Sequence, residues 1–266
     1  MKNTQIISVI NQKGGVGKTT TVINLATALS FQKKKILIID LDPQGNSTTG
    51  FGLSNNNDGK TIYDVLNGNC SFEESIKGTK IENLKLVSAN VDLSGLEVET
   101  ASESRRAFLL KDKITEFIKS DKNNFSYIFI DCPPSLSLLT IMALVAAQSL
   151  IVPLQAEFFA LEGLSQLIKT IDRIKINLNP KLDVRGVLLT MFDRRNKLSS
   201  QVDAEAREFF KNKVYQTVIP RNVRLSEAPS HGCPVLVYDK SCSGSKAYLN
   251  FTDEFLKQEN LMDSAA

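Results

Sequence analysis

Histidine, cysteine and tryptophan are scarce in this sequence, and their scarcity excludes several kinds of site. The 266 residues include one histidine, four cysteines and no tryptophan. The cysteines, at positions 70, 132, 233 and 242, form no C-x-x-C pair, and His231 has no second histidine beside it. A protein zinc site is therefore not expected. Cys132 has no histidine near it in the sequence to act as its base, so we interpret it as a packing residue and His231 as a structural one.

Long apolar stretches and a strong charge imbalance are missing as well. No apolar run approaches the ~20 residues that a membrane span needs, and Met1–Gln5 leads directly into a predicted strand without a targeting segment. The net charge is only +3, so affinity for nucleic acid would have to come from a local basic patch. These features predict a reduced, cytoplasmic protein without stable membrane association.

Short apolar runs alternate with longer segments of helical period along the chain. Residues 105–119 and 161–178 are predicted to be helices. Eight runs rich in valine, isoleucine and leucine are predicted to be strands: 6–10, 36–40, 84–88, 127–131, 150–154, 184–190, 214–219 and 235–238. Such alternation predicts an α/β fold with a doubly wound, mostly parallel sheet flanked by helices. We expect a single domain over 1–266, a polar surface turn at 54–59 and a frayed tail at 259–266.

A glycine- and lysine-rich loop follows the first predicted strand and precedes a helical segment. It fits the phosphate-binding pattern G-x-x-x-x-G-K-[ST] at its last three positions, whereas Gln12 replaces the first glycine. Lys13 adds a second positive charge at the entrance. In such loops backbone N–H groups surround phosphates and the hydroxyl binds Mg²⁺. The predicted nucleotide-binding residues are Lys13, Gly14, Gly15, Val16, Gly17, Lys18, Thr19 and Thr20.

Three aspartates end predicted strands at the edge where open α/β sheets bind ligands. Asp40 and Asp42 follow the second strand, and Asp131 ends the apolar run 127–131. Asp131 has the position of a carboxylate that stands near magnesium in phosphate-loop enzymes. Asp42 is placed to orient or deprotonate an attacking water, and Asp40 to hold Mg²⁺ through water. Capping or turn duty is the alternative interpretation of each.

Three segments together resemble the deviant Walker-A ATPases: the loop 13–19, the run Asp40-Leu41-Asp42-Pro43-Gln44-Gly45-Asn46, and Asp131-Cys132-Pro133-Pro134-Ser135-Leu136. Further segments at 160–164, 186–191 and 218–232 resemble the ParA/Soj chromosome-partitioning branch, and the last of these is the most discriminating. The resemblance extends from about residue 5 to about residue 250. It implies a phosphate-loop fold and slow, partner-stimulated hydrolysis of ATP with Mg²⁺.

The resemblance also implies roles for single residues. Lys13 would be the signature lysine, which reaches across a homodimer to the partner's phosphates and stabilises transition-state charge there. Lys18 would bind phosphate within its own subunit, and Asp42 would activate water. The implied magnesium residues are Thr19, Asp40 and Asp131. Pro220 and Asn222, with Arg221 between them, resemble the loop that borders the adenine.

The same family binds double-stranded DNA without sequence preference as an ATP-dependent dimer. Residues 190–224 of this chain hold eight lysines and arginines against four acids, a local excess of +4. Arg195 and Arg224 match positions that contact DNA in the family. Lys211 is a third candidate, because Arg207 and Lys211 are four residues apart and would form a basic stripe on one helix. The implied stimulating partner is a ParB-like centromere-binding protein, and the implied location is the nucleoid.

Three other functions remain open at this stage. A membrane-cycling ATPase of the MinD type resembles the chain around the phosphate loop, but it needs a basic amphipathic helix, and residues 251–261 are mixed in charge. An electron-transfer ATPase like the nitrogenase iron protein needs two suitably spaced cluster ligands per subunit. A small-molecule kinase needs a second substrate pocket. Too few residues precede Ile6 for a helix-turn-helix domain, so sequence-specific operator binding is not expected.

Overall fold

A seven-stranded sheet forms the centre of the computed structural model, which describes residues 4–53, 59–120, 124–157 and 160–265. Its strand order is β3-β4-β2-β5-β1-β6-β7. The strands are β1 (Gln5–Val9), β2 (Ile36–Asp40), β3 (Ile76–Gly78), β4 (Leu84–Val87), β5 (Tyr127–Asp131), β6 (Ser149–Gln155) and β7 (Asp183–Thr190). All neighbouring pairs are parallel except β3 with β4, which is antiparallel. The predicted mostly parallel α/β fold is confirmed.

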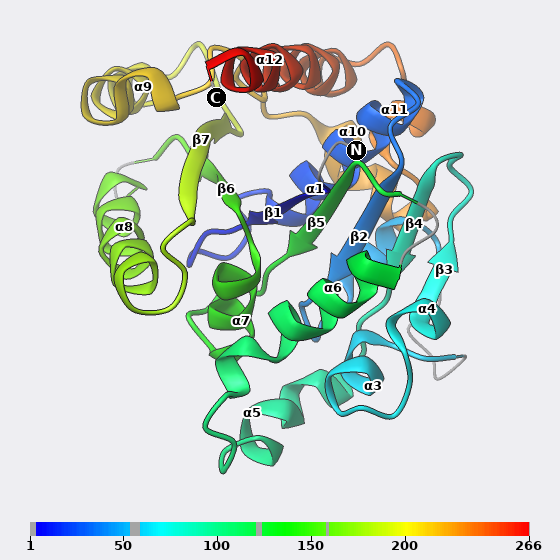
Figure 1. The fold of residues 1–266 in the computed structure, drawn as a ribbon. Coiled ribbons are helices and arrows are strands. Elements are labelled where there is room, and N and C mark those ends of the chain that lie inside the picture. Colours follow the sequence, from blue (N-terminus) through cyan, green and yellow to red (C-terminus); the bar gives the residue numbers. More distant parts are fainter. Residues whose placement is uncertain (1–3, 54–58, 121–123, 158–159, 266) are drawn as a thin grey trace.

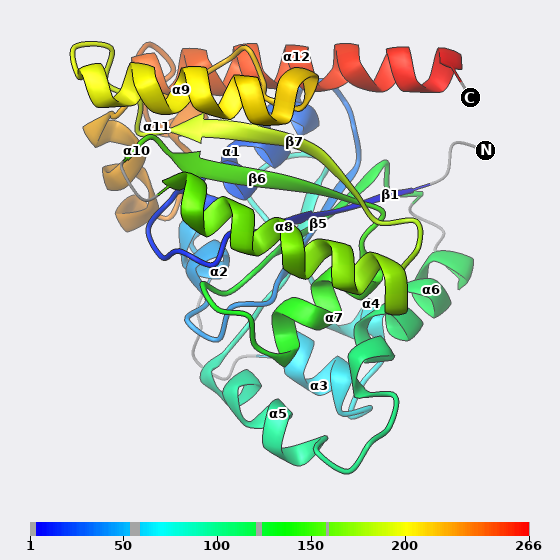
Figure 2. The same ribbon diagram turned by 90° about the vertical axis from the view of Figure 1, so that its left-hand side faces the viewer.

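Helices cover both faces of the sheet (Figure 1; Figure 2). The longer ones are α1 (Lys18–Phe31), α6 (Leu109–Ser120), α7 (Leu138–Ala146), α8 (Ala160–Asn177), α9 (Lys197–Phe210) and α12 (Ser243–Ala265). The short ones are α2 (Asn46–Gly50), α3 (Ile62–Leu66), α4 (Phe72–Ser75), α5 (Leu96–Glu99), α10 (Val223–Glu227) and α11 (Val235–Tyr238). Single 3-10 turns lie at Val91–Gly95, Arg106–Phe108, Lys211–Lys213 and Ala228–His231.

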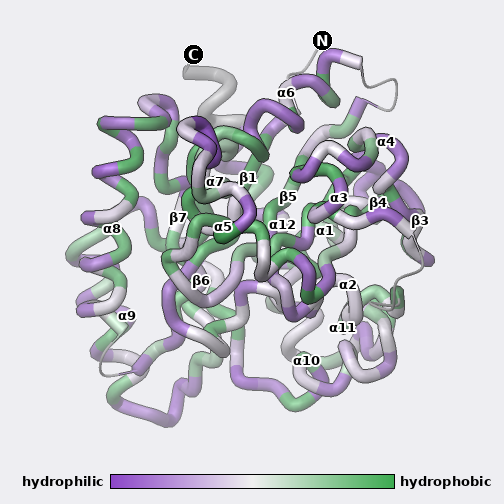
Figure 3. The backbone as a smooth tube through the Cα atoms, turned by 90° about the horizontal axis from the view of Figure 1, so that it is seen from below, coloured by the Kyte–Doolittle hydropathy of each residue, from purple (hydrophilic) through white to green (hydrophobic). Residues whose placement is uncertain are grey.

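Alternate residues of each strand pack against different layers of helices. Ile6, Ile128 and Leu150 belong to a hydrophobic cluster with α6, α7 and α8, whereas Ile7 and Phe129 belong to a second cluster with α1 and α12. This division follows from the two-residue period of a strand, which sends successive side chains to opposite faces. In Figure 3 the hydrophobic positions gather in the strands, and α8 and α9 alternate between hydrophilic and hydrophobic positions. Burial on both faces explains the continuous apolar runs of the sequence.

The carboxyl ends of the parallel strands bring the predicted site residues to one edge of the sheet. The loop at 10–17 follows β1, Asp40 ends β2, Asp131 ends β5 and Thr190 ends β7. Val9 pairs with Asp131 in the ladder between β1 and β5, so the loop begins beside that carboxylate. The topology therefore builds a ligand site at this edge.

Two strand predictions are wrong. Residues 214–219 run beside β7 but form a single isolated bridge with it, between Val214 and Val187, because the Glu254 carboxylate accepts the backbone N–H groups of Gln216 at 2.6 Å and Thr217 at 2.9 Å. Residues 235–238 form the helix α11 after Pro234, since a four-residue apolar run does not distinguish strand from helix.

The predicted helices differ from the observed ones only at their ends. The helix predicted at 105–119 begins as a 3-10 turn and becomes α-helical at Leu109, and the helix predicted at 161–178 is α8. The antiparallel edge strand β3 was not predicted. Most of the polar turn predicted at 54–59 lies outside the described residues. No helix in the described parts of the chain is both long and apolar enough to span a bilayer.

Candidate nucleotide site

Two glycines shape the loop between β1 and α1. Gly15 has φ 74° and Gly17 has φ 89°, in the left-handed region where a side chain would strain the backbone. The helix α1 begins at the next residue, Lys18, so its first backbone N–H groups face the loop. The Thr190 hydroxyl donates to the Val16 carbonyl at 2.8 Å and ties the loop to the end of β7. This geometry presents N–H groups to an anion, as the sequence pattern predicts.

The side chains of Asn11 and Lys18 bond to the backbone N–H and the backbone carbonyl of Lys13. The Asn11 side chain accepts the Lys13 N–H at 3.0 Å and donates to the Pro153 carbonyl at 2.7 Å. Lys18 Nζ donates to the Lys13 carbonyl at 3.0 Å. Burial lowers the pKa of the Lys18 ammonium, and the nearby Asp131 opposes that shift. A phosphate would supply the acceptors that this nearly buried ammonium needs.

Asp131 is the carboxylate best suited to a magnesium ion. It is fully buried, its Oδ2 accepts the Ser47 hydroxyl at 2.7 Å, and the Thr19 hydroxyl also bonds to it. Its Oδ1 is buried and has no hydrogen-bond partner among the described residues. Burial raises its pKa above the ordinary aspartate value. An orphaned carboxylate oxygen beside a threonine hydroxyl fits Mg²⁺, which is bound by one or two carboxylates plus waters and substrate phosphates.

Asp40 holds the start of α2. Its Oδ2 accepts the Thr48 N–H at 2.8 Å and the Thr48 hydroxyl at 2.7 Å, and its Oδ1 accepts the Asp42 N–H at 3.3 Å. Burial, and then the charge of Asp131, raise its pKa. Both oxygens of Asp40 thus bond to protein groups, and its role toward metal through water stays a prediction.

A cavity of about 740 Å³ opens in front of the loop. Asp42 lines it, with one carboxylate oxygen bonded to the Gln44 N–H at 3.0 Å. Pro220 and Asn222, predicted at the adenine, line the same cavity. Its other walls come from Gly14, Gly15, Gly17, Lys18, Thr19, Thr20, Ile23, Asn46, Thr49, Pro134, Thr190, Met191, Ile219, Arg221, Val223, Leu225, Ser226, Pro229, Ser230 and Tyr248. The structure therefore brings most of the predicted nucleotide residues and the predicted water-activating residue to one space, whereas Val16 is buried and does not line the cavity.

Lys13 points elsewhere. Its ammonium forms an ion pair with the Glu157 carboxylate, in the segment between β6 and α8, and about half of its side chain is exposed. The cavity lining includes neighbours of Lys13 in the loop but not Lys13 itself. In this structure the Lys13 ammonium thus lies against Glu157 and does not line its own subunit's nucleotide cavity.

Tyr248 is a cavity residue that the sequence did not indicate. Its buried hydroxyl shares a 3.2 Å hydrogen bond with the Thr21 hydroxyl, so α12 is joined to the helix that starts at the phosphate loop. Tyr248 is followed by Phe251 and Phe255 at helical spacing, and all three are buried. That spacing marks a buried helix face, but it carries no sign of a ligand.

A second cavity, of about 760 Å³, adjoins the first and is basic. Arg194, Arg195, Arg221 and Lys246 line it, with Asp193 as the acid among its lining residues. Arg221 also lines the nucleotide cavity. We call this the basic groove. Of these four, only Arg195 was predicted to contact DNA. Arg221 was assigned to the loop that borders the adenine, Arg194 was counted in the basic segment 190–224, and Lys246 comes from α12, more than fifty positions further along the chain.

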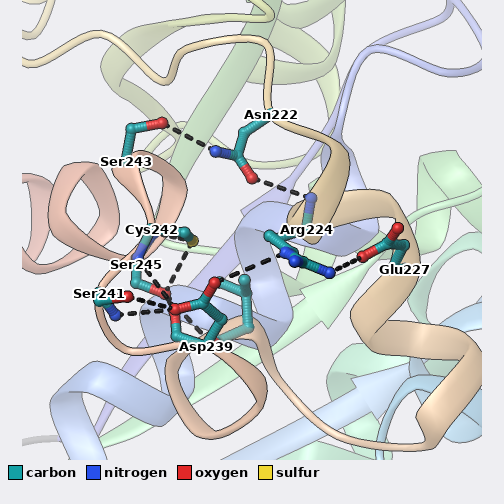
Figure 4. A network of polar contacts seen from close by, with 9 residues as sticks. Asn222, Arg224, Glu227, Asp239, Ser241, Cys242, Ser243 and Ser245 are labelled. Carbon is teal, nitrogen blue, oxygen red and sulfur yellow. Dashed lines mark hydrogen bonds and ion pairs between the residues drawn. The ribbon is translucent and has the colours of Figure 1, made fainter.

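Intramolecular carboxylates neutralise two of the arginines predicted to contact DNA. The guanidinium of Arg195 donates to both oxygens of Asp193, at 3.0 and 2.9 Å, although its side chain is 90% exposed. Arg224 contacts Glu227 at 2.8 Å and Asp239 at 3.6 Å (Figure 4). The Asn222 side chain accepts the Arg224 N–H at 2.9 Å. Because Asn222 also lines the nucleotide cavity, it connects that cavity to the backbone of Arg224.

The basic stripe predicted for Arg207 and Lys211 is wrong. The helix α9 ends at Phe210, and Lys211 has a φ of 51°. Arg207 turns toward the protein, where it donates to Asp203 at 2.7 Å and to the Tyr215 carbonyl at 3.1 Å. The fourteen residues of α9 span about 20 Å, so Lys211 lies at the opposite end of the helix from Arg195.

Cys132 and His231 have the structural surroundings that the sequence suggested. Cys132 is buried and burial raises the pKa of its thiol, which disfavours a reactive thiolate. His231 stacks on Tyr238 with ring centroids 4.8 Å apart. Among the described residues, no group of three or more histidine, cysteine or acidic side chains is arranged to hold a metal.

Comparison with known proteins agrees with this geometry. Residues 4–184 match a family model described as an AAA domain. The chain is 50% identical over 255 residues to the chromosome partitioning protein ParA of Caulobacter vibrioides, covering 96% of this chain and 95% of that one. It is 47% identical to the sporulation initiation inhibitor protein Soj of Bacillus subtilis, covering 94% and 97%. The chain belongs to the ParA/Soj family of P-loop ATPases.

Solved structures of similar shape hold nucleotides. A cobyrinic acid a,c-diamide synthase from Mycobacterium smegmatis, with bound ATP analogue and magnesium, has a TM-score of 0.84 and 33% identity, covering 96% of this chain and 95% of that one. A putative plasmid partition protein from Borrelia burgdorferi bound to AMPPNP has a TM-score of 0.81 and 27% identity, covering 96% and 100%. MinD from Pyrococcus horikoshii with Mg-ADP is more distant, at 0.76 and 26%, covering 95% and 96%. The fold of this chain is thus shared by proteins of several named activities that bind adenine nucleotides.

Proposed function

We propose that this protein is a DNA-partitioning ATPase. With ATP and Mg²⁺ it forms a homodimer that binds double-stranded DNA without sequence preference, and a ParB-like centromere-binding protein stimulates hydrolysis and release. A cycle of this kind segregates a chromosome or a plasmid and keeps the protein on the nucleoid. The observation that supports it most is the shared wall of the two cavities: Pro220 and Arg221 line both the nucleotide cavity and the basic groove.

The residues divide the hydrolytic work as follows. Lys18 and the N–H groups at the start of α1 bind the phosphates. Thr19 and Asp131 hold the magnesium ion, which neutralises developing charge when bound. Asp42 orients the attacking water from the cavity wall. Lys13 contributes its charge to the partner's phosphates, and Pro220 and Asn222 border the adenine.

The DNA contact rests on Arg195 and Arg224, to which the structure adds three cations of the basic groove, Arg194, Arg221 and Lys246. Phosphate contacts of this kind carry affinity without sequence information. Lys211 stays a prediction with less support, since it lies at the far end of α9.

DNA retention with ATP and with ADP tests the proposal, using wild type, Arg195→Glu and a control charge reversal, Arg173→Glu, at an exposed position of α8 outside the groove. We expect wild type to be retained strongly with ATP and weakly with ADP. Arg195→Glu should lose the retention with ATP, and Arg173→Glu should be retained like wild type. Equal binding with the two nucleotides, or normal binding by Arg195→Glu, would contradict the proposed function.

A further inference from the structure

The ion pair between Lys13 and Glu157 has no place in the proposed hydrolytic cycle, and it occupies the group on which that cycle depends. The Lys13 ammonium contacts the Glu157 carboxylate of its own chain. An ammonium that moves onto a partner's phosphates gives up part or all of its contact with Glu157, because each of its three N–H groups donates to one acceptor. The intramolecular contact therefore competes with the intermolecular one.

Three contacts hold Lys13 in its present direction. Its N–H donates to Asn11, its carbonyl accepts Lys18 Nζ, and its side chain reaches Glu157. Asn11 is bonded to the Pro153 carbonyl of β6, and Glu157 follows that strand, so β6 anchors both ends of the arrangement. The Glu157 carbonyl accepts the Ala160 N–H at 3.0 Å, which fixes the segment relative to the start of α8.

The two side chains are accessible enough to exchange partners. The side chain of Lys13 is 53% exposed and that of Glu157 is 31% exposed, so water competes for both and the pair is weak. A contact of this strength disfavours the movement of Lys13 from Glu157 to a partner's phosphates, but it does not prevent that movement. A phosphate group also accepts charge-assisted hydrogen bonds from an ammonium, and it offers more charged oxygens than a carboxylate.

We propose that Glu157 is a positioning residue that holds Lys13 on its own subunit until the partner's nucleotide replaces it. The inference rests on the proposed function, because it requires Lys13 to act across a dimer. Glu157 thereby raises the threshold for ATP-dependent dimerisation and lowers hydrolysis in the absence of a stimulating partner.

Dimerisation with a non-hydrolysable ATP analogue, measured by analytical ultracentrifugation, tests the inference. Glu157→Gln keeps the shape of the side chain and removes its charge. Asp172→Asn, at an exposed position of α8, is the matched control. We expect Glu157→Gln to tighten the dimer about two- to thirtyfold, because each dimer contains two of these partly exposed ion pairs, and Asp172→Asn to leave it unchanged. Unchanged or weaker dimerisation in Glu157→Gln would overturn the inference.

Two further measurements separate this inference from the proposed function. In Lys13→Ala, the added change Glu157→Gln should have no effect on dimerisation, because the ammonium that it holds is gone. If Lys13→Ala alone dimerises like wild type, the proposed role of Lys13 is wrong. If Lys13→Ala does not dimerise and Glu157→Gln dimerises like wild type, the role of Lys13 stands and only the proposed role of Glu157 is wrong. In the nucleotide-free protein, the NMR signal of reductively ¹³C-methylated Lys13 should shift in Glu157→Gln and stay in place in Asp172→Asn.

Discussion

Replacing Asp239 by asparagine should make the protein bind DNA more tightly. In the structure the Asp239 carboxylate lies 3.6 Å from the Arg224 guanidinium, and it also accepts the N–H and the hydroxyl of Ser241 at 3.0 and 2.8 Å. An asparagine oxygen preserves the bonds to Ser241 and removes the negative charge. Arg224 then has Glu227 as its remaining carboxylate partner, and the guanidinium is released to a phosphate more easily.

The salt dependence of binding gives this prediction its magnitude. Each phosphate neutralised contributes about −0.9 to the slope of log K against log salt concentration. A dimer carries two copies of Arg224, so Arg224→Ala should reduce the steepness by about 1.8. Between about 50 and about 200 mM salt, the ratio of wild-type to variant affinity should therefore fall by about tenfold. Asp239→Asn keeps both arginines, so we expect a similar slope with an affinity about two- to threefold higher at each concentration.

Fluorescence anisotropy of a labelled duplex, with a non-hydrolysable ATP analogue across this salt range, measures both quantities. Ser241→Ala is a useful control, because it removes a hydrogen bond to Asp239 and leaves every charge in place. If Arg224→Ala retained the wild-type slope, Arg224 would not contact a phosphate. If Asp239→Asn bound DNA no better than Ser241→Ala, the carboxylate would not compete with DNA for the arginine.

Three further predictions concern hydrolysis, magnesium and packing. Asp42→Ala should lower the ATPase rate by about 10²-fold or more and yield a long-lived dimer on DNA; wild-type turnover would remove Asp42 from its assigned role. Burial raises the pKa of Asp131, so the folded protein retains a proton there that the unfolded chain loses, and its stability falls as pH rises from about 4 toward neutrality. The additional stabilisation that Mg²⁺ gives to the ADP-bound protein, measured by thermal melting, should therefore grow with pH and be absent in Asp131→Asn. A Cβ at Gly186 would lie 2.4 Å from the Tyr215 ring, so Gly186→Ala should lower the free energy of unfolding by about 1–3 kcal/mol in urea titration.

Local patterns were sufficient to predict six of the seven strands because these strands are mostly buried, whereas the edge strand β3 is not. The runs at 36–40 and 127–131 contain five buried residues each, and no partially exposed position interrupts them. The same argument failed at 214–219, where the chain is apolar at Val214, Val218 and Ile219 and the backbone bonds to Glu254 of α12. That partner lies about forty residues away, and periodicity within a short window carries no information about it.

The phosphate loop and its carboxylates were predictable for a different reason. Their spacing reflects local requirements of backbone conformation and position. Glycines stand where φ is positive, a lysine and a hydroxyl stand at the start of α1, and aspartates stand at strand ends. The basic groove had no such signature. Arg195 and Lys246 meet only because α12 returns across the sheet to lie beside the β7–α9 connection. Charge density along the chain located part of the groove and missed the contribution of α12.

The charge count along the sequence also concealed how these cations are held. Residues 190–224 carry an excess of positive charge, yet Arg195 is paired with Asp193 and Arg224 with Glu227, and Lys13 is paired with Glu157 in another segment. Three of the cations that we propose to act on a partner molecule, Lys13, Arg195 and Arg224, thus have a carboxylate of their own chain as a substitute ligand. Binding to DNA or to a second subunit then exchanges one ionic contact for another, and the carboxylate that loses its cation is left to solvent. The net free energy of each exchange is small, because a partly exposed pair is weak to begin with. Tight association must therefore come from several exchanges made together, and a dimer doubles their number.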